Sequence, residues 1–438
     1  MKTTESLPLV NPLAAGVDVG SQKMFVSIAG GRPEIFGCCT ADLERLRDYL
    51  LGHGVRTVAM EATGVYWLCL YGVLEAAGLT VLVVNGAHVK NVPGRKTDML
   101  DCQWLATLHA HGLLRSGFVP PAEIRRLRDY QRVRSDLVRM SAEHVQHMQK
   151  ALERLNLKFH TVISSIVGTS GWRLIRAILT GQRNPVALLA LCDEQIRRKK
   201  SEDLLKALQG NWQAEHLFAL RLAVEGWEFY QNQIQACDQE MARIIQELAG
   251  SDPEPSLGPR KELRNNAPKN MPRLQGWLGQ IYGTDLTRIP GLNPYSVTLL
   301  LSEVGTDMSR WPSVKHFTSW LGLTPGQNQS GKRKGQKKRH TGKAGRTFCL
   351  VAQSMAFAKN TKFGAIYRRI RARRGGPTAL KATARRLAEM FYLALTRGWD
   401  YVEQGLETYE AHFRAQQERH LQRLAKDLGF AITPAIPA

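Results

Sequence analysis

The stretch that decides the fold is LAAGVDVGSQKMFVSIAGGRPEIFGCC, residues 13–39. Residues 13–20 and 24–30 are short runs of Ala, Val, Ile, Phe and Gly, which predict a β-hairpin. Residues 34–39 continue as a third strand. We therefore expect the chain to begin with a three-stranded meander.

Helices and strands alternate after this meander. The sequence pattern predicts a helix over 40–54, a strand over 57–62, a helix over 65–78, a strand over 79–85 and a helix over 97–112. Three meandering strands followed by helix, strand, helix, strand and helix is the order of the RNase H-like fold. The sequence therefore predicts an RNase H-like α/β domain over residues 1–115.

Four acidic residues fall at the elements that build one site in such a sheet. Asp18 ends the first strand and Glu61 ends the fourth, and these two strands are neighbours in the RNase H-like order. Asp98 and Asp101 are three residues apart on a helix and therefore share a face. A surface or capping role is common for any one acid, but converging carboxylates repel each other unless cations lie between them. Oxygen ligands at a phosphate-processing site favour Mg²⁺ or Mn²⁺.

The positive charge of the chain is concentrated in its C-terminal part. The 438 residues carry a formal net charge of +22, and residues 326–400 hold 19 Lys and Arg against two acids, Glu389 and Asp400. Residues 1–115 hold 10 basic and 10 acidic residues. So dense a basic region repels itself unless a polyanion neutralises it, and this predicts nucleic-acid binding.

Two clusters carry most of this charge, SGKRKGQKKRHTGKAGR at 330–346 and YRRIRARRGG at 367–376. The first is rich in glycine, and we expect an open loop whose lysines lie along phosphates. The second is rich in arginine, which suits groove or bidentate phosphate contacts. The candidate nucleic-acid-binding residues are Lys332, Arg333, Lys334, Lys337, Lys338, Arg339, Lys343, Arg346, Arg368, Arg369, Arg371, Arg373 and Arg374.

The sequence pattern of residues 116–249 predicts a coiled coil with a helical insertion at 156–212. Apolar residues recur at steps of three and four in two stretches, which predicts two helices that pair either antiparallel within the chain or between subunits. The first seam is Val138, Ser141, Val145, Met148, Leu152 and Leu155, and the second is Ile234, Cys237, Met241, Ile244 and Leu248.

A proline-rich linker at 250–272 separates this region from a mainly helical C-terminal domain, expected over 273–415 and followed by a polar tail at 416–438. This domain opens with LTRIPGLNPYSVTLLLSEVG, residues 286–305, where a helix, a Pro290-Gly291 turn and an apolar helix suggest a helix-hairpin-helix-like motif. The backbone N–H groups of such a turn can bind a DNA phosphate. A Pro-Gly turn between packed helices is also common without that role.

Several function classes lack support in the sequence. The seven cysteines form no CxxC pair and the histidines form no HExxH, so a zinc site and disulfides are not expected. No GxxxxGK[ST] motif occurs, which argues against nucleotide hydrolysis. No apolar run reaches membrane-spanning length and the N-terminus lacks a signal-peptide core, so we expect a cytoplasmic protein without membrane contact.

Two groups of motifs resemble one known family. GVDVGSQK around Asp18, MEATGVYW around Glu61 and KTDMLDCQWLA around Asp98 and Asp101 resemble the RuvC-like DEDD domain of the bridge-RNA-guided transposases of insertion sequence 110 and its 1111 subgroup, which are related to the Piv invertases. IPGLNPYSVTLLLSEVG, FTSWLGLTPGQNQSG and HTGKAGR resemble the C-terminal transposase domain of that family. The resemblance extends over nearly the whole chain.

This resemblance implies a mechanism and its partners. The family's nucleophilic serine follows the LGLTP-like segment, a position held here by Ser330. The resemblance implies that Ser330 attacks a phosphate of double-stranded donor or target DNA and forms a 5′-phosphoserine, with Mg²⁺ on Asp18, Glu61, Asp98 and Asp101. It also implies a non-coding guide RNA and a homodimer that assembles into a tetramer, in which the acids of one subunit meet the serine of another. The location would be the prokaryotic cytoplasm, at the nucleoid when active.

Two other functions remain open on the sequence. One is a metal-dependent, structure-specific nuclease similar to a Holliday-junction resolvase, which would use the four acids and water without a covalent step. The other is a non-catalytic DNA-binding or RNA-binding protein. A covalent protein–DNA adduct distinguishes a recombinase from a nuclease, and metal-dependent strand cleavage excludes the non-catalytic function.

Overall fold

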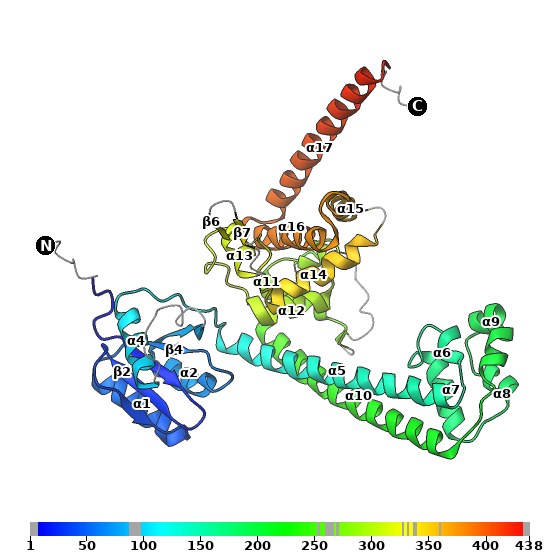
Figure 1. Cartoon of the computed structure of the whole chain (residues 1–438), viewed down its shortest axis with the longest axis horizontal. Helices are drawn as coiled ribbons and strands as arrows, with labels where there is room; N and C mark the ends of the chain where they lie inside the picture. The colour runs from blue at the N-terminus through cyan, green and yellow to red at the C-terminus, as the bar shows by residue number, and fades with distance from the viewer. Residues whose placement is uncertain are drawn as a thin grey trace. The chain divides into compact units, whose positions relative to one another are not determined.

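The computed structural model describes residues 8–86, 98–251, 255–258, 267–268, 271–325, 328–330, 333–335, 340–358 and 361–431. The chain forms two compact units, Met1–Val119 and Pro120–Ala438 (Figure 1).

The N-terminal unit contains a five-stranded sheet in the order β3-β2-β1-β4-β5. Its strands are β1 (Ala15–Val19), β2 (Met24–Ile28), β3 (Glu34–Phe36), β4 (Thr57–Glu61) and β5 (Thr80–Val84). β1, β2 and β3 pair antiparallel, whereas β4 pairs parallel with both β1 and β5. This topology fits the RNase H-like fold expected from the sequence.

Helices cover this sheet because their apolar residues recur at helical spacing. In α1 (Thr40–Gly52), Leu43, Leu46 and Leu50 are buried. Together with Leu70 and Leu74 of α2 (Trp67–Ala76), they pack in one core with the alternate strand residues Ala15, Val17, Val19, Met24 and Val26. A further helix, α4 (Asp98–Ala110), packs against β1, β2 and β4.

The second unit contains two long helices, α5 (Ala122–Arg154) and α10 (Ala214–Ala249), which pack side by side (Figure 1). They run antiparallel, because Arg134 of α5 pairs with Asp238 of α10 while Ser141, farther along α5, accepts a hydrogen bond from the earlier residue Gln231. The structure therefore shows the within-chain pairing. Most seam residues, among them Ser141, Met148, Leu152, Leu155, Ile234, Met241 and Ile244, are buried.

Four short helices occupy the insertion between α5 and α10: α6 (Phe159–Val162), α7 (Thr169–Leu179), α8 (Pro185–Ala190) and α9 (Glu194–Ala207). They enclose an apolar core that includes Phe159, Leu174, Ile175 and Leu204, each fully buried. The same core takes in Met148 and Leu152 of α5 and Leu220 of α10, so the insertion packs on the adjacent ends of both long helices.

The C-terminal part of this unit is mainly helical. Its helices are α11 (Leu274–Tyr282), the 3₁₀ helix η1 (Leu286–Arg288), α12 (Pro294–Val304), α13 (Val314–Trp320), α14 (Lys343–Ala356), α15 (Lys362–Arg374), α16 (Gly376–Arg397) and α17 (Trp399–Asp427). Phe317, Phe348 and Phe391 are fully buried, and the ring of Phe391 contacts both of the others. α17 continues to Asp427, well past Ala415, where the helical domain was expected to end.

The helix-hairpin-helix-like motif differs from the expectation. Only the single 3₁₀ turn η1 precedes the Pro290-Gly291 turn, because Gly283 ends α11 in a left-handed conformation and Asp285 accepts a hydrogen bond from the backbone of Thr287. Gly291 has φ +83°, and a Cβ atom on it would lie 2.9 Å from Val351 of α14. The turn therefore packs against α14 at this residue.

No helix among the described residues is long and apolar enough to cross a membrane. All seven cysteines are free thiols. Much of the expected linker, residues 252–254, 259–266 and 269–270, lies outside the described residues.

Candidate active site

Asp18 and Glu61 stand at the same level of adjacent parallel strands. Gly16 pairs with Ala59 and Val17 with Met60, so the next position of each strand is Asp18 on β1 and Glu61 on β4. Paired residues of neighbouring strands project to the same face of a sheet. Both acids are half-buried. The structure thus places two of the four predicted acids side by side at the carboxyl ends of these strands.

The helix that carries the other two acids covers this same face. Side chains alternate along a strand, so Gly16 and Asp18 share one face. A Cβ atom on Gly16 would lie 2.3 Å from the carbonyl oxygen of Cys102 and 2.3 Å from the amide nitrogen of Ala106. The backbone of α4 therefore rests directly on β1, two residues before Asp18.

A hydrogen bond between α4 and β4 shows that α4 also covers the face of β4 that carries Glu61. Thr57 and Glu61 are four residues apart and project to the same side. The hydroxyl of Thr57 and Nε2 of His109 in α4 are 2.8 Å apart. Because burial disfavours the imidazolium, the pKa of His109 is lowered. A neutral imidazole thus joins the last turn of α4 to the start of β4.

α4 runs antiparallel to β1, and this direction brings its first turn toward Asp18. Near the start of β1, Asn11 donates a hydrogen bond to the carbonyl of His109 at the end of α4. Gly16 then meets the middle of the helix at Cys102 and Ala106. The first turn of α4, which begins at Asp98 and contains Asp101, consequently lies beyond Gly16 in the direction of Asp18.

The environment of Cys102 shows that Asp18 and Asp101 lie near the same point. Burial, aided by the nearby carboxylates of Asp18 and Asp101, raises the pKa of the Cys102 thiol to about 11. Asp101 is half-buried, whereas Cys102 is fully buried beneath the helix. The side chain of Asp98 lies outside the described residues, although its backbone begins α4.

Gly86 leaves the space that the Glu61 carboxylate occupies. A Cβ atom on Gly86, two residues past β5, would lie 1.9 Å from Oε1 of Glu61. Gly86 is itself buried. Any larger residue at this position would displace the carboxylate, so the end of β5 helps to set where Glu61 points.

The donors present suit a divalent cation that prefers oxygen. Asp18, Glu61 and Asp101 offer carboxylate oxygens on one face of the sheet, the ligand type that Mg²⁺ and Mn²⁺ prefer. Within the part of the chain that the structure describes, no three His, Cys, Asp or Glu side chains are gathered closely enough to hold a metal ion. The residue types and their shared face therefore fit a metal, while the side chains are not drawn together around one.

Ser330 lies in the second unit, on a short hairpin. β6 (Asn328–Ser330) pairs antiparallel with β7 (Arg333–Gly335), and Ser330 pairs with Arg333. The expectation of an open loop over 330–346 is therefore wrong for Ser330 and for Arg333–Gly335, because backbone pairing holds both strands, and for Lys343 onward, where α14 begins. The side chain of Ser330 lies outside the described residues.

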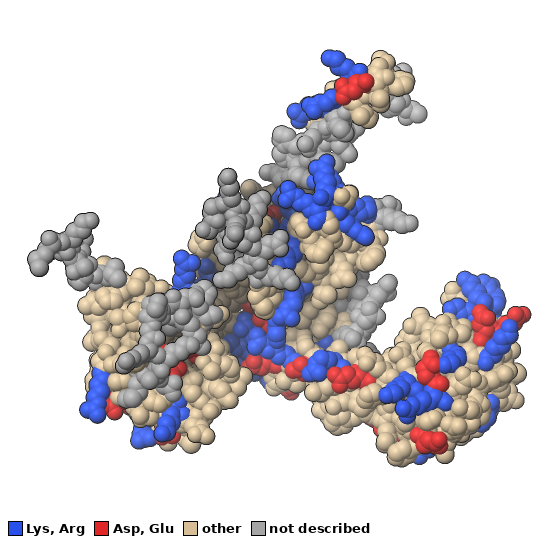
Figure 2. Space-filling model, viewed as in Figure 1, with Lys and Arg blue, Asp and Glu red and all other residues tan. Residues whose placement is uncertain are grey.

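The predicted basic residues divide between these strands and two helices. Arg333 and Lys334 lie on β7, Lys343 and Arg346 in the first turn of α14, and Arg368 to Arg374 along α15. Figure 2 shows Lys and Arg side chains gathered over α15, where Arg371, Arg373 and Arg374 are exposed. Lys332, Lys337, Lys338 and Arg339 lie outside the described residues.

Two family models match the chain. A model of DEDD-type IS110 transposases, described as "Transposase", matches residues 15–157, from the first residue of β1 to just past α5. A second model, "Transposase IS116/IS110/IS902 family", matches residues 283–368, and the two together cover about half of the chain. The chain belongs to the IS110 family of transposases. The transposase is thus an enzyme that cleaves and transfers DNA. None of the curated proteins matches it.

The matched segments contain the two candidate sets of residues in this transposase. Residues 15–157 include β1, β4 and α4, with Asp18, Glu61, Asp98 and Asp101. Residues 283–368 include the hairpin with Ser330 and the first turn of α14. The helical insertion at 156–212 lies almost wholly outside both matches.

The basic residues predicted from the sequence did not include Arg132 of α5, which lies near Lys343 in this transposase. Burial, together with the like charges of Arg132 on α5 and Arg346, lowers the pKa of Lys343. Arg132 is 3.5 Å from a carboxylate oxygen of Glu303, at the end of α12. The signal was absent from the sequence because Arg132 and Lys343 lie far apart along the chain and come together through the packing of both α5 and α14 on α12.

Proposed function

We propose that this transposase exchanges strands of double-stranded donor and target DNA under the guidance of a non-coding bridge RNA, as a member of the 1111 subgroup. The observation that carries the proposal is the placement of Asp18, Glu61 and the first turn of α4 on one face of the RNase H-like sheet. Three carboxylates on one face could bind a divalent cation that in turn contacts a phosphate.

In this proposal Asp18, Glu61, Asp98 and Asp101 hold Mg²⁺ or Mn²⁺. The bound metal would polarise a phosphoryl oxygen and stabilise the charge that develops on the attacking and leaving oxygens. The chain's own contribution is positional. Gly16 lets α4 approach β1 closely, and Gly86 leaves room for the Glu61 carboxylate.

Ser330 is the proposed nucleophile. Its Oγ attacks the scissile phosphorus, the new Oγ–P bond replaces the P–O3′ bond, and the hydroxyl proton ends on the departing 3′ oxygen or on solvent. The 5′ end is then held as a phosphoserine until a 3′ hydroxyl of another strand attacks it and restores a phosphodiester. Backbone pairing of Ser330 with Arg333 supports this role, since the hairpin fixes the backbone of the serine.

The acids belong to one compact unit and Ser330 to the other. The proposal has the acids of one subunit meet the serine of another, so that cleavage needs a dimer and strand exchange needs a tetramer. The basic residues of β7, α14 and α15 supply contacts to DNA and RNA phosphates, which are sequence-independent. The guide RNA then selects which DNA sequences are joined. We place this reaction in the cytoplasm, at the nucleoid.

The experiment is a reconstituted recombination reaction with purified transposase, donor and target plasmids, and the RNA that copurifies with the protein. We expect recombinant junctions only when protein, RNA and divalent metal are all present. Ribonuclease treatment before mixing should abolish the junctions, and adding the RNA back should restore them. Junctions formed at full yield after ribonuclease treatment would contradict RNA guidance, and cleavage without junctions would favour the nuclease function.

A further inference from the structure

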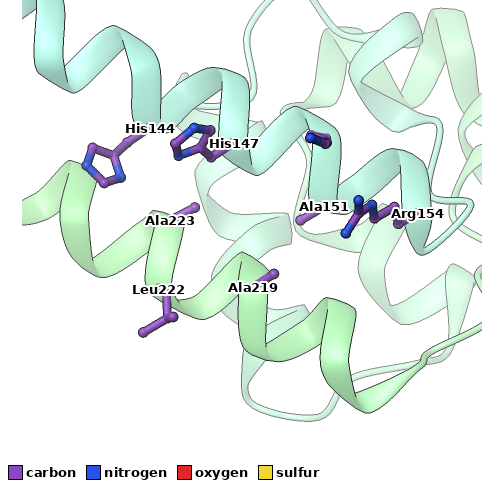
Figure 3. A pocket seen from close by; sticks show the side chains of 8 residues that line it. His144, His147, Ala151, Arg154, Ala219, Leu222 and Ala223 are labelled. Atoms are coloured by element: carbon purple, nitrogen blue, oxygen red, sulfur yellow. The ribbon is translucent and has the colours of Figure 1, made fainter.

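A cavity of about 290 Å³ lies between α5 and α10, far along the sequence from the acids and from Ser330. Figure 3 shows His144 and His147 on α5 above Ala223 of α10, with Arg154 farther along α5. The residues that line the cavity are His144, His147, Lys150, Ala151, Arg154, Ala219, Leu222 and Ala223.

Small residues create this space in an otherwise close-packed helix pair. Ala151, Ala219 and Ala223 stand where larger side chains would fill the groove between the helices. One turn further on, Gly226 meets the imidazole of His144 directly, because a Cβ atom there would lie 2.3 Å from Cε1 of the ring. The ring of His144 is therefore held against the backbone of α10, at one end of the cavity.

The polar side chains that line the cavity, two histidines, a lysine and an arginine, all carry nitrogen. Nδ1 of His144 is buried and has no hydrogen-bond partner among the described residues. The ring of His147 lies edge-on to that of His144, with centroids 5.7 Å apart. Lys150 and Arg154 follow on the same face of α5 and are exposed. Two cationic side chains and two imidazoles thus line one side of the cavity.

Among the residues that the structure describes, no acidic residue lines this cavity. The acids that flank these four residues along α5 are engaged elsewhere. Glu143 pairs with Arg139, and Glu153 pairs with Lys158 and hydrogen-bonds to His160. These two carboxylates therefore have partners other than Lys150 and Arg154.

The chemistry of the lining selects the ligand. A metal cation suits two imidazoles but is repelled by Lys150 and Arg154. An anion with several oxygens can accept hydrogen bonds from Arg, Lys and imidazole N–H groups together, and a phosphate is such an anion. We propose that this cavity binds a backbone phosphate of a nucleic acid, as a contact separate from the C-terminal basic residues. The proposal rests on nucleic-acid binding by the transposase, and the source of the phosphate is DNA or RNA.

The test compares the full-length Lys150→Ala/Arg154→Ala variant with a matched control, Lys199→Ala/Arg221→Ala. All four side chains are exposed, both variants lose two positive charges, and neither control residue lines the cavity. Binding of a labelled DNA duplex and of a labelled RNA hairpin is measured by fluorescence anisotropy over a range of salt concentrations. The measured quantity is the slope of log binding constant against log salt concentration, called the salt slope below. We expect the magnitude of the salt slope to fall by about 0.7 to 0.9 for each phosphate that the cavity variant no longer binds, and to stay unchanged in the control.

A second variant, Ala219→Leu, keeps every charge and fills the cavity at a half-buried position. We expect this variant to bind more weakly to the same probe for which the Lys150→Ala/Arg154→Ala variant loses affinity, with an unchanged thermal unfolding temperature. A change with DNA alone or RNA alone identifies the source of the phosphate. Equal slopes for the cavity variant and the control on both probes would overturn the site while leaving the proposed function intact. Failure of the unaltered transposase to bind either probe would contradict both.

Discussion

The backbone of Cys102 lies directly against Gly16, so that α4 and β1 meet with no side chain between them. This contact sets the distance between the sheet and the helix that carries Asp101. It also places the Cys102 thiol near the carboxylates of Asp18 and Asp101, and burial together with these two charges raises the pKa of the thiol. The geometry of the acidic site therefore depends on a glycine that has no chemical role.

Replacing Gly16 with alanine should separate α4 from β1. The added Cβ would stand 2.3 Å from backbone atoms, which cannot move as a flexible side chain can. We expect the free energy of unfolding to fall by about 1–3 kcal/mol, measured by urea denaturation, and recombination to fall with it. Gly72→Ala in α2 is the control, since nothing lies within 4 Å of its Cβ position and stability should rise by up to about 1 kcal/mol. Equal stability of the two variants would show that α4 does not rest on Gly16.

Neutralising the acids should stop the reaction without unfolding the protein. Asp18→Asn, Glu61→Gln and Asp101→Asn each preserve shape but remove a negative charge from the proposed metal site. A loss of about 3–4 kcal/mol of transition-state stabilisation corresponds to a rate about 10²- to 10³-fold lower, measured as recombinant junctions over time. Asp48→Asn, an exposed acid on α1, is the control and should react at the normal rate. Full activity in EDTA would rule out the metal.

The buried ion pair between Arg134 and Asp238 should be a strong determinant of stability in the helix pair. Both side chains are almost fully buried, and Arg134 also donates a hydrogen bond to the hydroxyl of Tyr295 on α12. Asp238→Leu should cost about 3–5 kcal/mol of unfolding free energy, because it leaves a buried guanidinium without its counter-ion.

The double variant Arg134→Met/Asp238→Leu should recover most of that loss, since neither charge then remains buried. Arg139→Ala breaks an exposed pair with Glu143 and should cost at most about 1 kcal/mol. Chemical denaturation of the three variants checks this prediction. A double variant as unstable as Asp238→Leu would mean that packing, rather than an unpaired charge, is responsible.

The end of α15 should contribute to DNA affinity through charge alone. Arg371, Arg373 and Arg374 are exposed in the last turn of this helix. Replacing all three with alanine should lower the magnitude of the slope of log DNA-binding constant against log salt concentration. The expected change is about 0.9 for each phosphate that is no longer bound, whatever the DNA sequence. The control replaces Arg197, Arg198 and Lys199 of α9, which are also exposed. If both triple variants show the same slope, α15 is not a preferred DNA-binding helix.

Local pattern was enough to predict the sheet. The apolar residues around Asp18 and Glu61 predicted that each acid stands at the end of a strand. The order of helices and strands predicted that these two strands are neighbours. The sequence does not show why α4 packs closely, since the need for glycine at positions 16 and 86 appears only when the helix and the Glu61 carboxylate are in place.

Other contacts between distant parts of the chain were not predictable from the sequence. The proximity of Arg132 to Lys343 arises from the packing of both α5 and α14 on α12, and no periodicity encodes it. The glycine-rich composition around Ser330 suggested a loop, whereas cross-strand backbone pairing forms a hairpin there. The cavity beside His144 was missed for a similar reason, because its alanines come from two helices.

The most direct test of the proposed mechanism is to look for a covalent bond between Ser330 and DNA. A reaction stalled on a nicked substrate is denatured and digested, and the peptide that contains Ser330 is analysed by mass spectrometry. We predict a nucleotide joined through a 5′ phosphate to Ser330, absent from Asp18→Asn and from Ser330→Ala, while Ser330→Ala still binds DNA and RNA. Cleaved DNA with free 5′ phosphates, no adduct, and a normal cleavage rate in Ser330→Ala would contradict the account.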